Sequence, residues 1–173
     1  ATSGWSGSGA TATKTVTFDS AYGTLPTADR TGYTFVGWYN SSGTQLTTDV
    51  KYTYTCSGST ATYYARFQAK TYTVTLDNQG ATTAGATSVT ATYNAAMPSI
   101  ANNLPKKTGY TFNGYFDAKS GGNQYYKADG TSARTWNKTS NTILYAQWTI
   151  TNYNITYENL NGVTHANPAT YNI

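Results

Sequence analysis

One segment of this chain occurs twice, and this repetition limits what the chain can fold into more than any other feature. The segment GYTFVGWY at residues 32–39 returns as GYTFNGYF at residues 109–116, and YARF at residues 64–67 returns as YAQW at residues 145–148. Self-similarity of this kind indicates that one small folding unit is copied in tandem. Tandem copies usually build length, a surface array or repeated binding points, and they rarely build a single catalytic cleft.

The second copy, residues 69–149, reads as a complete unit. It is predicted to open with a strand at residues 71–77 and to continue with a second strand near residues 88–93. A crossover marked by prolines then leads to the GYTF segment, and the unit closes on a strand at residues 143–148.

The other two copies are incomplete in opposite ways. The first copy, residues 14–68, lacks the opening strand, because its residues 15–19 align with the second strand of the complete copy. A third copy begins in residues 150–173, where YNITYE resembles the opening segment YTVTLD. Residues 1–13 are rich in Gly, Ser, Thr and Ala and are expected to be flexible or extended.

The composition favours strands over helices. Aromatic residues make up 15% of the chain and charged residues only 10%. Threonine and tyrosine suit a pleated, half-buried surface, and apolar residues alternate in the segments named above. Only residues 99–104 favour a helix, as one short turn capped by Ser99. The sequence therefore predicts an all-β to β-grasp-like fold (α+β with minimal helix), with two small tandem β domains plus an extra C-terminal strand.

Charge and residue patterns argue against several classes of function. The net charge of +4 comes from 11 basic and 7 acidic residues, and Lys106-Lys107 is the one basic doublet, so no nucleic-acid partner is expected. No apolar run is long enough for membrane insertion. His165 is the single histidine, so neither a metal site nor another cofactor is expected. No set of nucleophile, base or paired carboxylates is evident, and the protein is predicted not to be an enzyme.

Two covalent features stay open at this level. Cys56 is the one cysteine, so it is either a small part-buried thiol or a partner in an intermolecular disulfide formed in an oxidising space. Lys70 or Lys14 could donate a Lys–Asn cross-link in an apolar core, which would lower the intact mass by one ammonia.

Matching aromatic doublets follow the GYTF segment in both copies. Trp38 and Tyr115, the first members, are predicted to fill the core, because alternate residues of a strand point to opposite faces. Tyr39 and Phe116, the second members, then point outward. They are candidates for a stacking platform that holds sugar rings, since aromatic side chains offer flat apolar faces.

These motifs resemble the Listeria–Bacteroides repeat, the family that includes the internalin B-repeat. The resemblance rests on YTV at residues 72–74, PKKTGYTF at residues 105–112, Gly114-Tyr115 and LYAQW at residues 144–148, with matching segments in the first copy. It implies a small β-grasp-like unit that occurs in tandem on large bacterial and archaeal surface proteins. It implies no catalytic residues.

The missing opening strand of the first copy and the extra opening strand of the third copy suggest how such units assemble. A sheet that lacks one strand exposes backbone groups and an apolar groove, and a free strand can fill both by strand addition. The tail strand, with Tyr153, Ile155 and Tyr157 on one face, is the predicted donor. The predicted acceptor is the first unit, beside Val16 and Phe18.

Two classes of function follow. The first is an extracellular structural or adhesive protein, in which copies assemble head-to-tail into a filament. In its plainer form the chain is a segment of a longer surface stalk, and neighbouring repeats supply the missing strand. The second is a carbohydrate-binding module that recognises surface glycans. Both place the protein outside the cell or on its surface, with itself, neighbouring repeats or glycans as partners.

Overall fold

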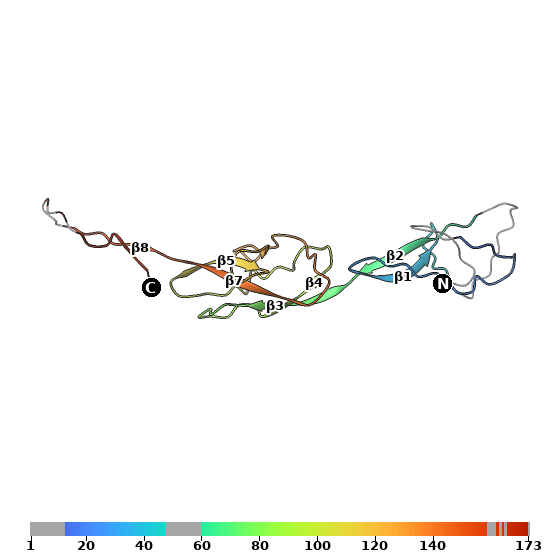
Figure 1. The fold of residues 1–173 in the computed structure, drawn as a ribbon, viewed down its shortest axis with the longest axis horizontal. Coiled ribbons are helices and arrows are strands. Elements are labelled where there is room, and N and C mark those ends of the chain that lie inside the picture. Colours follow the sequence, from blue (N-terminus) through green and yellow to red (C-terminus); the bar gives the residue numbers. More distant parts are fainter. Residues whose placement is uncertain (1–12, 48–59, 159–161, 163, 165, 173) are drawn as a thin grey trace. The chain divides into compact units, whose positions relative to one another are not determined.

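The structure is a computed structural model that describes residues 13–47, 60–158, 162, 164 and 166–172. The chain divides into two compact units, unit 1 from Ala1 to Lys70 and unit 2 from Thr71 to Ile173 (Figure 1). No helix occurs among the described residues, which confirms the prediction of a small, tandem, all-β protein. Accordingly, no described segment is a helix long and apolar enough to cross a membrane.

Unit 2 is built on one mixed sheet of five strands. The strands are β3 (Thr71–Asp77), β4 (Ser88–Thr92), β5 (Tyr110–Phe116), β6 (Gln124–Tyr126) and β7 (Thr142–Ile150), in the spatial order β4-β3-β7-β5-β6. Strands β3 and β7 run parallel, and the other pairs run antiparallel. The first and last long strands of the unit therefore lie side by side in the middle of the sheet.

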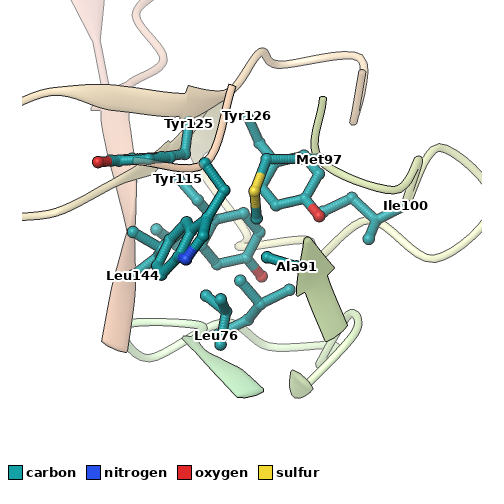
Figure 2. Packing of buried hydrophobic residues seen from close by; sticks show 11 residues of the cluster. Leu76, Ala91, Met97, Ile100, Tyr115, Tyr125, Tyr126 and Leu144 are labelled. Atoms are coloured by element: carbon teal, nitrogen blue, oxygen red, sulfur yellow. The ribbon is translucent and has the colours of Figure 1, made fainter. Parts of the chain in front are cut away.

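One face of this sheet carries the core of unit 2. Alternate residues of β3, β5 and β7 point to this face and meet side chains of the connecting segments. In Figure 2, Leu76 and Ala91 lie on one side of the cluster, Tyr125 and Tyr126 lie on the other, and Met97 and Ile100 close one end. The cluster consists of Val74, Leu76, Ala91, Met97, Ile100, Tyr115, Tyr125, Tyr126, Trp136, Leu144 and Ala146.

The buried tyrosines of this core keep their hydroxyl groups hydrogen-bonded. The Tyr115 hydroxyl donates to Asn78 Oδ1 at 2.6 Å, and the Tyr126 hydroxyl donates to the Pro98 carbonyl at 2.8 Å. Burial raises the pKa of Tyr115 far above its ordinary value, and the nearby Asp77 charge adds to the effect. The core therefore holds neutral, hydrogen-bonded phenols rather than charges.

Unit 1 repeats part of this sheet. Strands β1 (Tyr33–Tyr39) and β2 (Tyr64–Ala69) form an antiparallel pair that corresponds to β5 and β7. A bulge interrupts β1 between Phe35 and Gly37 and β5 between Phe112 and Gly114. Both bulge glycines have positive φ, 149° and 123°. The repeated Gly thus marks a backbone position that other residues adopt only with strain.

The turn that starts both strands is also the same. Gly32 and Gly109 adopt φ of 77° and 76°. In each unit the N–H of the following tyrosine donates to a carbonyl three residues back, Arg30 or Lys107, at 3.0 Å. The first glycine of the repeated segment is therefore required by a left-handed turn position.

The strand predicted at residues 15–19 is not formed, so that prediction was wrong. Its turn is present, because Ser20 N–H donates to the Thr17 carbonyl at 3.1 Å, as Ala95 N–H does to Thr92. In unit 2 the corresponding strand β4 pairs with β3 alone. Unit 1 has no described counterpart of β3, so this segment lacks the hydrogen-bonding partner that would make it a strand.

The short helix predicted at residues 99–104 is a turn instead. Ser99 Oγ accepts a hydrogen bond from Ala101 N–H at 3.3 Å, so Ser99 does act as a local cap. Asn103 N–H donates to Ile100, and the Asn103 carbonyl is used by Ala86 N–H at 2.9 Å. The adjacent Pro105 also disfavours helical conformation in the residue before it.

The tail of the chain forms a hairpin of two-residue strands, β8 (Tyr153–Asn154) and β9 (Thr170–Tyr171). The predicted C-terminal strand thus begins at β8 and pairs with the segment that follows it. Three features named from the sequence lie outside the described residues: Cys56, His165 and nearly all of residues 1–13.

Candidate functional site

The candidate site is the edge of β2 that faces away from β1. The final strand β7 of unit 2 has nine residues, whereas its counterpart β2 has six. The residues missing from β2 are 61–63, which correspond to residues 142–144 of β7. Those residues of β7 are among the ones that pair with β3. Unit 1 therefore loses strand conformation at the positions where the parallel partner is lacking among the described residues.

The exposure of matching side chains differs in the same way. Tyr64 is 58% exposed, whereas its counterpart Tyr145 is half-buried next to β3. Trp38 is half-buried, whereas its counterpart Tyr115 is fully buried. In unit 2 the side chains of β3 cover this part of the core, and no described strand of unit 1 does so.

A cavity of about 310 Å³ lies on the other side of these residues, the side that faces β1. It occupies the fork between the chain that leaves β1, residues 40–42, and the chain that leads into β2, residues 60–64. Residues 61–64 correspond to the β3-pairing segment of the complete unit, and no described strand pairs with their edge away from β1. We call residues 61–64 the acceptor edge.

The hairpin β8–β9 corresponds to the part that unit 1 lacks. Tyr153 occupies the position of Tyr72 on β3, and Ile155 N–H donates to the Ala169 carbonyl at 2.9 Å. The hairpin β3–β4 makes the same kind of bond, from Leu76 N–H to the Thr87 carbonyl at 2.8 Å. The tail therefore repeats the antiparallel pairing of β3 with β4, and the N–H groups of alternate residues point to the hairpin partner in both.

The predicted donor side chains have little cover. Tyr153 is 39% exposed, and its ring lies 5.3 Å from that of Tyr171, which is 51% exposed. Ile155 and Tyr157 are half-buried, and the Tyr157 hydroxyl donates to the Pro168 carbonyl at 3.1 Å. Their counterparts on β3 lie in the core. The hairpin thus has strands with an apolar face and, among the described residues, no sheet that covers it.

The residues predicted from the sequence to accept the donor strand, Val16 and Phe18, lie in unit 1 but are distant in sequence from residues 61–64. Val16 is half-buried and Phe18 is 58% exposed, and neither belongs to a strand. The donor residues lie in unit 2. Sequence reasoning missed residues 61–64, which correspond to the part of β7 that pairs with β3. The sequence shows that residues 63–67 align with residues 144–148. It does not show that residues 142–145 pair in parallel with β3, which is why the alignment alone did not identify this edge.

The outward aromatic residues have neighbours on the sheet surface. Tyr39 lies opposite Tyr64 in the register of β1 and β2, and the Arg66 guanidinium sits 4.2 Å from the centroid of the Tyr39 ring. Phe116 lies opposite Tyr145 in the same way, and both side chains are half-buried. One face of the Tyr39 ring is therefore already covered by a cation.

The loop after β5 is held by one carboxylate. Burial by itself would raise the pKa of Asp117, but hydrogen bonds from the Asn123 backbone and side chain and from Lys138 outweigh it and lower the pKa to about 2. Asp117 Oδ2 lies 3.0 Å from Lys138 Nζ. Among the described residues no group of three or more His, Cys, Asp or Glu side chains is placed to hold a metal ion.

Comparison with known proteins agrees with the repeated architecture. The Listeria-Bacteroides repeat domain matches residues 4–66 and 72–147, once in each unit. Internalin H of Listeria monocytogenes serovar 1/2a (strain ATCC BAA-679 / EGD-e) is 35% identical over 129 residues, which cover 73% of this chain and 20% of that protein. No solved structure matches. The chain belongs to the Listeria-Bacteroides repeat family.

Proposed function

We propose that the chain is a non-enzymatic structural segment of a cell-surface or extracellular protein, and that unit 1 is completed by the tail hairpin of a second copy. Membership of the Listeria-Bacteroides repeat family and the similarity to an internalin support the surface role. The chain spans a fifth of the length of that internalin. In this assembly the repeats of one copy join those of the next, and a series of such joins forms a filament.

The observation that carries the proposal is the local loss of strand at residues 61–63. Exposed strand edges accept an extended segment by main-chain hydrogen bonding, with side-chain pockets that set the register. The acceptor edge, the exposed Tyr64 and the half-buried Trp38 lie in the same unit. The hairpin β8–β9 supplies the strand type that the complete unit uses at this position.

Unit 2 provides the expected register. Val74 pairs with Thr142 and Asp77 with Tyr145. Transferred to the corresponding positions, Ile155 pairs with Ala61 and Glu158 with Tyr64. Ile155 and Tyr157 then face the core of unit 1, as Val74 and Leu76 do in unit 2. Burying one such side chain stabilises by about 1.5–3 kcal/mol.

The geometry of this contact is head-to-tail. The donor hairpin and the acceptor edge are different surfaces, so each copy can give a strand to one neighbour and take a strand from another. Such heterologous contacts form rings if the rotation closes and open filaments if it does not. Completion by an adjacent repeat of the same polypeptide would use the same surfaces without a second copy.

Disulfide trapping tests the register directly. In a Cys56→Ser background, Thr62→Cys and Thr156→Cys are placed in two separate chains, which are mixed and oxidised. Both side chains are exposed, and the proposed register puts them side by side. We expect a cross-linked heterodimer, because Cα atoms of paired strands lie within the range of about 4.4–6.8 Å that a disulfide spans.

The matched control replaces Thr156→Cys by Asn154→Cys, which lies on the same face two residues away. A diagonal neighbour is about 7–8 Å away, so this pair should cross-link weakly. Equal cross-linking of both pairs, or none for either, would overturn the proposed register. Cross-linking only within a single chain that carries both cysteines would instead assign the completion to the same polypeptide and overturn assembly between copies.

A further inference from the structure

Unit 2 has a second feature, distinct from the acceptor edge, that points to a ligand. A groove of about 410 Å³ lies between the crossover that contains Lys106 and Lys107 and the aromatic side chains of Tyr110, Phe112 and Trp148. This volume falls within the range of small-molecule sites, about 300–1,000 Å³. We propose that this groove binds an acidic carbohydrate, a sugar chain that carries carboxylate or sulfate groups.

The floor of the groove is aromatic and fixed in place. Phe112 and Trp148 are half-buried with ring centroids 5.3 Å apart, and both pack against the core. Trp148 Nε1–H donates to the Asn78 carbonyl at 3.3 Å, which orients the indole. Flat rings of this kind suit the C–H faces of a pyranose, and a rigid aromatic surface loses little entropy on binding.

The rim of the groove is cationic. Lys107 Nζ lies 4.5 Å from the centroid of the Tyr110 ring, and Lys106 is exposed beside it. Neither lysine forms an ion pair with a carboxylate among the described residues. The ion pair of Lys138 with Asp117 joins the segment before β7 to the loop after β5. The net charge of the whole chain is also positive, at +4. A ligand that lays a C–H face on the aromatic floor and holds its anionic group at the lysines of the rim is complementary to this arrangement.

Unit 1 repeats the arrangement, although its sequence differs at the cation. The Arg30 guanidinium carbon lies 4.1 Å from the centroid of the Tyr33 ring and 5.9 Å from that of Phe67. Phe35 and Phe67 have ring centroids 5.8 Å apart, as the counterparts of Phe112 and Trp148. A cation over the tyrosine of the GYTF segment, beside a pair of aromatic rings, is thus built twice. Tandem weak sites of one kind suit a repeating polymer, because binding at one raises the effective concentration at the next.

The test measures binding of a hexamer of galacturonic acid to the full chain by titration calorimetry, with maltohexaose as the neutral comparison. We expect the acidic hexamer to bind and the neutral one not to bind. The variant Lys106→Met/Lys107→Met should weaken binding on the order of ten-fold, because charge-assisted hydrogen bonds are lost while the apolar stems keep their packing. Thermal unfolding checks that the variant is folded.

The matched control is Lys14→Met/Lys119→Met, which removes the same charge at residues that line neither the groove nor its counterpart in unit 1 and should bind as the parent chain does. An equal loss in both double variants would show a general charge effect and overturn the groove as the site. Loss on Tyr39→Ala or Phe116→Ala without loss in the Lys106/Lys107 variant would place the sugar on the outward platform and overturn it as well. Because Lys106 and Lys107 lie in unit 2 and belong to neither the acceptor edge at residues 61–64 nor the tail hairpin, the result for their double variant is independent of strand addition.

Discussion

At the scale of single residues, the bulge glycines carry the most specific backbone requirement. Gly114 has a φ of 123°, and a Cβ there would overlap the Tyr126 carbonyl oxygen. Gly121 also has a positive φ, 64°, but a Cβ there meets nothing within 4 Å. The two positions separate the cost of a left-handed backbone from the cost of a steric clash.

We expect Gly114→Ala to destabilise the protein by about 3 kcal/mol or more, because strand β6 would have to move. Gly121→Ala should cost about 1–2 kcal/mol, the penalty of the left-handed backbone conformation alone. Thermal unfolding of both variants beside the parent measures the difference. Equal losses would contradict the steric argument.

The Asp117 carboxylate predicts a pH dependence. Its pKa in the folded protein is about 2, below the ordinary 3.8, so its contribution is present above about pH 4 and is lost as the pH falls toward 2. The contribution is at most about 2 kcal/mol. Asp117→Asn should therefore have a lower free energy of unfolding than the parent at pH 6. This difference should become smaller at pH 2, as measured by chemical denaturation at both pH values. A difference in free energy of unfolding that stays constant between pH 2 and pH 6 would contradict the stabilising role of the Asp117 carboxylate.

At the scale of elements, one strand depends on another that is remote in sequence. Strand β7 extends three residues beyond its counterpart β2, and the extension is the part that pairs with β3. Residues 15–19 keep the turn of their counterpart but not its strand. Both differences have the same cause, since strand pairing requires a partner and local propensity does not supply one.

This dependence predicts the effect of a proline in the donor. Leu76 N–H donates within the hairpin β3–β4, so the N–H of Thr75 points toward β7, and Thr156 is its counterpart. Thr156→Pro removes the donor that faces the acceptor and leaves the Ile155–Ala169 bond of the hairpin available. We expect it to abolish head-to-tail association in analytical ultracentrifugation, whereas Thr156→Val should associate as the parent does. Unchanged association of the proline variant would rule out main-chain pairing at this position.

At the scale of the whole molecule, the proposed assembly joins residues 61–64 of one copy to the tail hairpin of another. We expect the full chain to form filaments in negative-stain electron microscopy and a version truncated before Thr151 to form none, because the truncation removes β8 and β9. Adding a peptide of residues 151–173 to the truncated chain should protect the amides of residues 61–64 from hydrogen exchange. Filaments from the truncated chain would show that the tail is not the donor strand.

Much of this molecule followed from sequence patterns, and the misses share a cause. The repeated GYTF segment predicted β1 and β5, and the alternation around Val74 and Leu76 predicted β3. The helix expected at residues 99–104 failed because Ala86 uses the Asn103 carbonyl and Pro105 follows. The acceptor edge was missed, since its position depends on which strands lie parallel, a contact between residues 74–77 and 142–145 that no local pattern encodes.

The sequence by itself determined the repeat, the turn and bulge glycines, and the face of each strand that becomes apolar. These features are local, because they follow from φ, from side-chain alternation and from the spacing of like residues. Tertiary structure alone decided which strands pair, where β2 ends and whether residues 15–19 form a strand. Those outcomes depend on hydrogen bonds between segments far apart in the chain, whose partners are brought together only when the sheet forms.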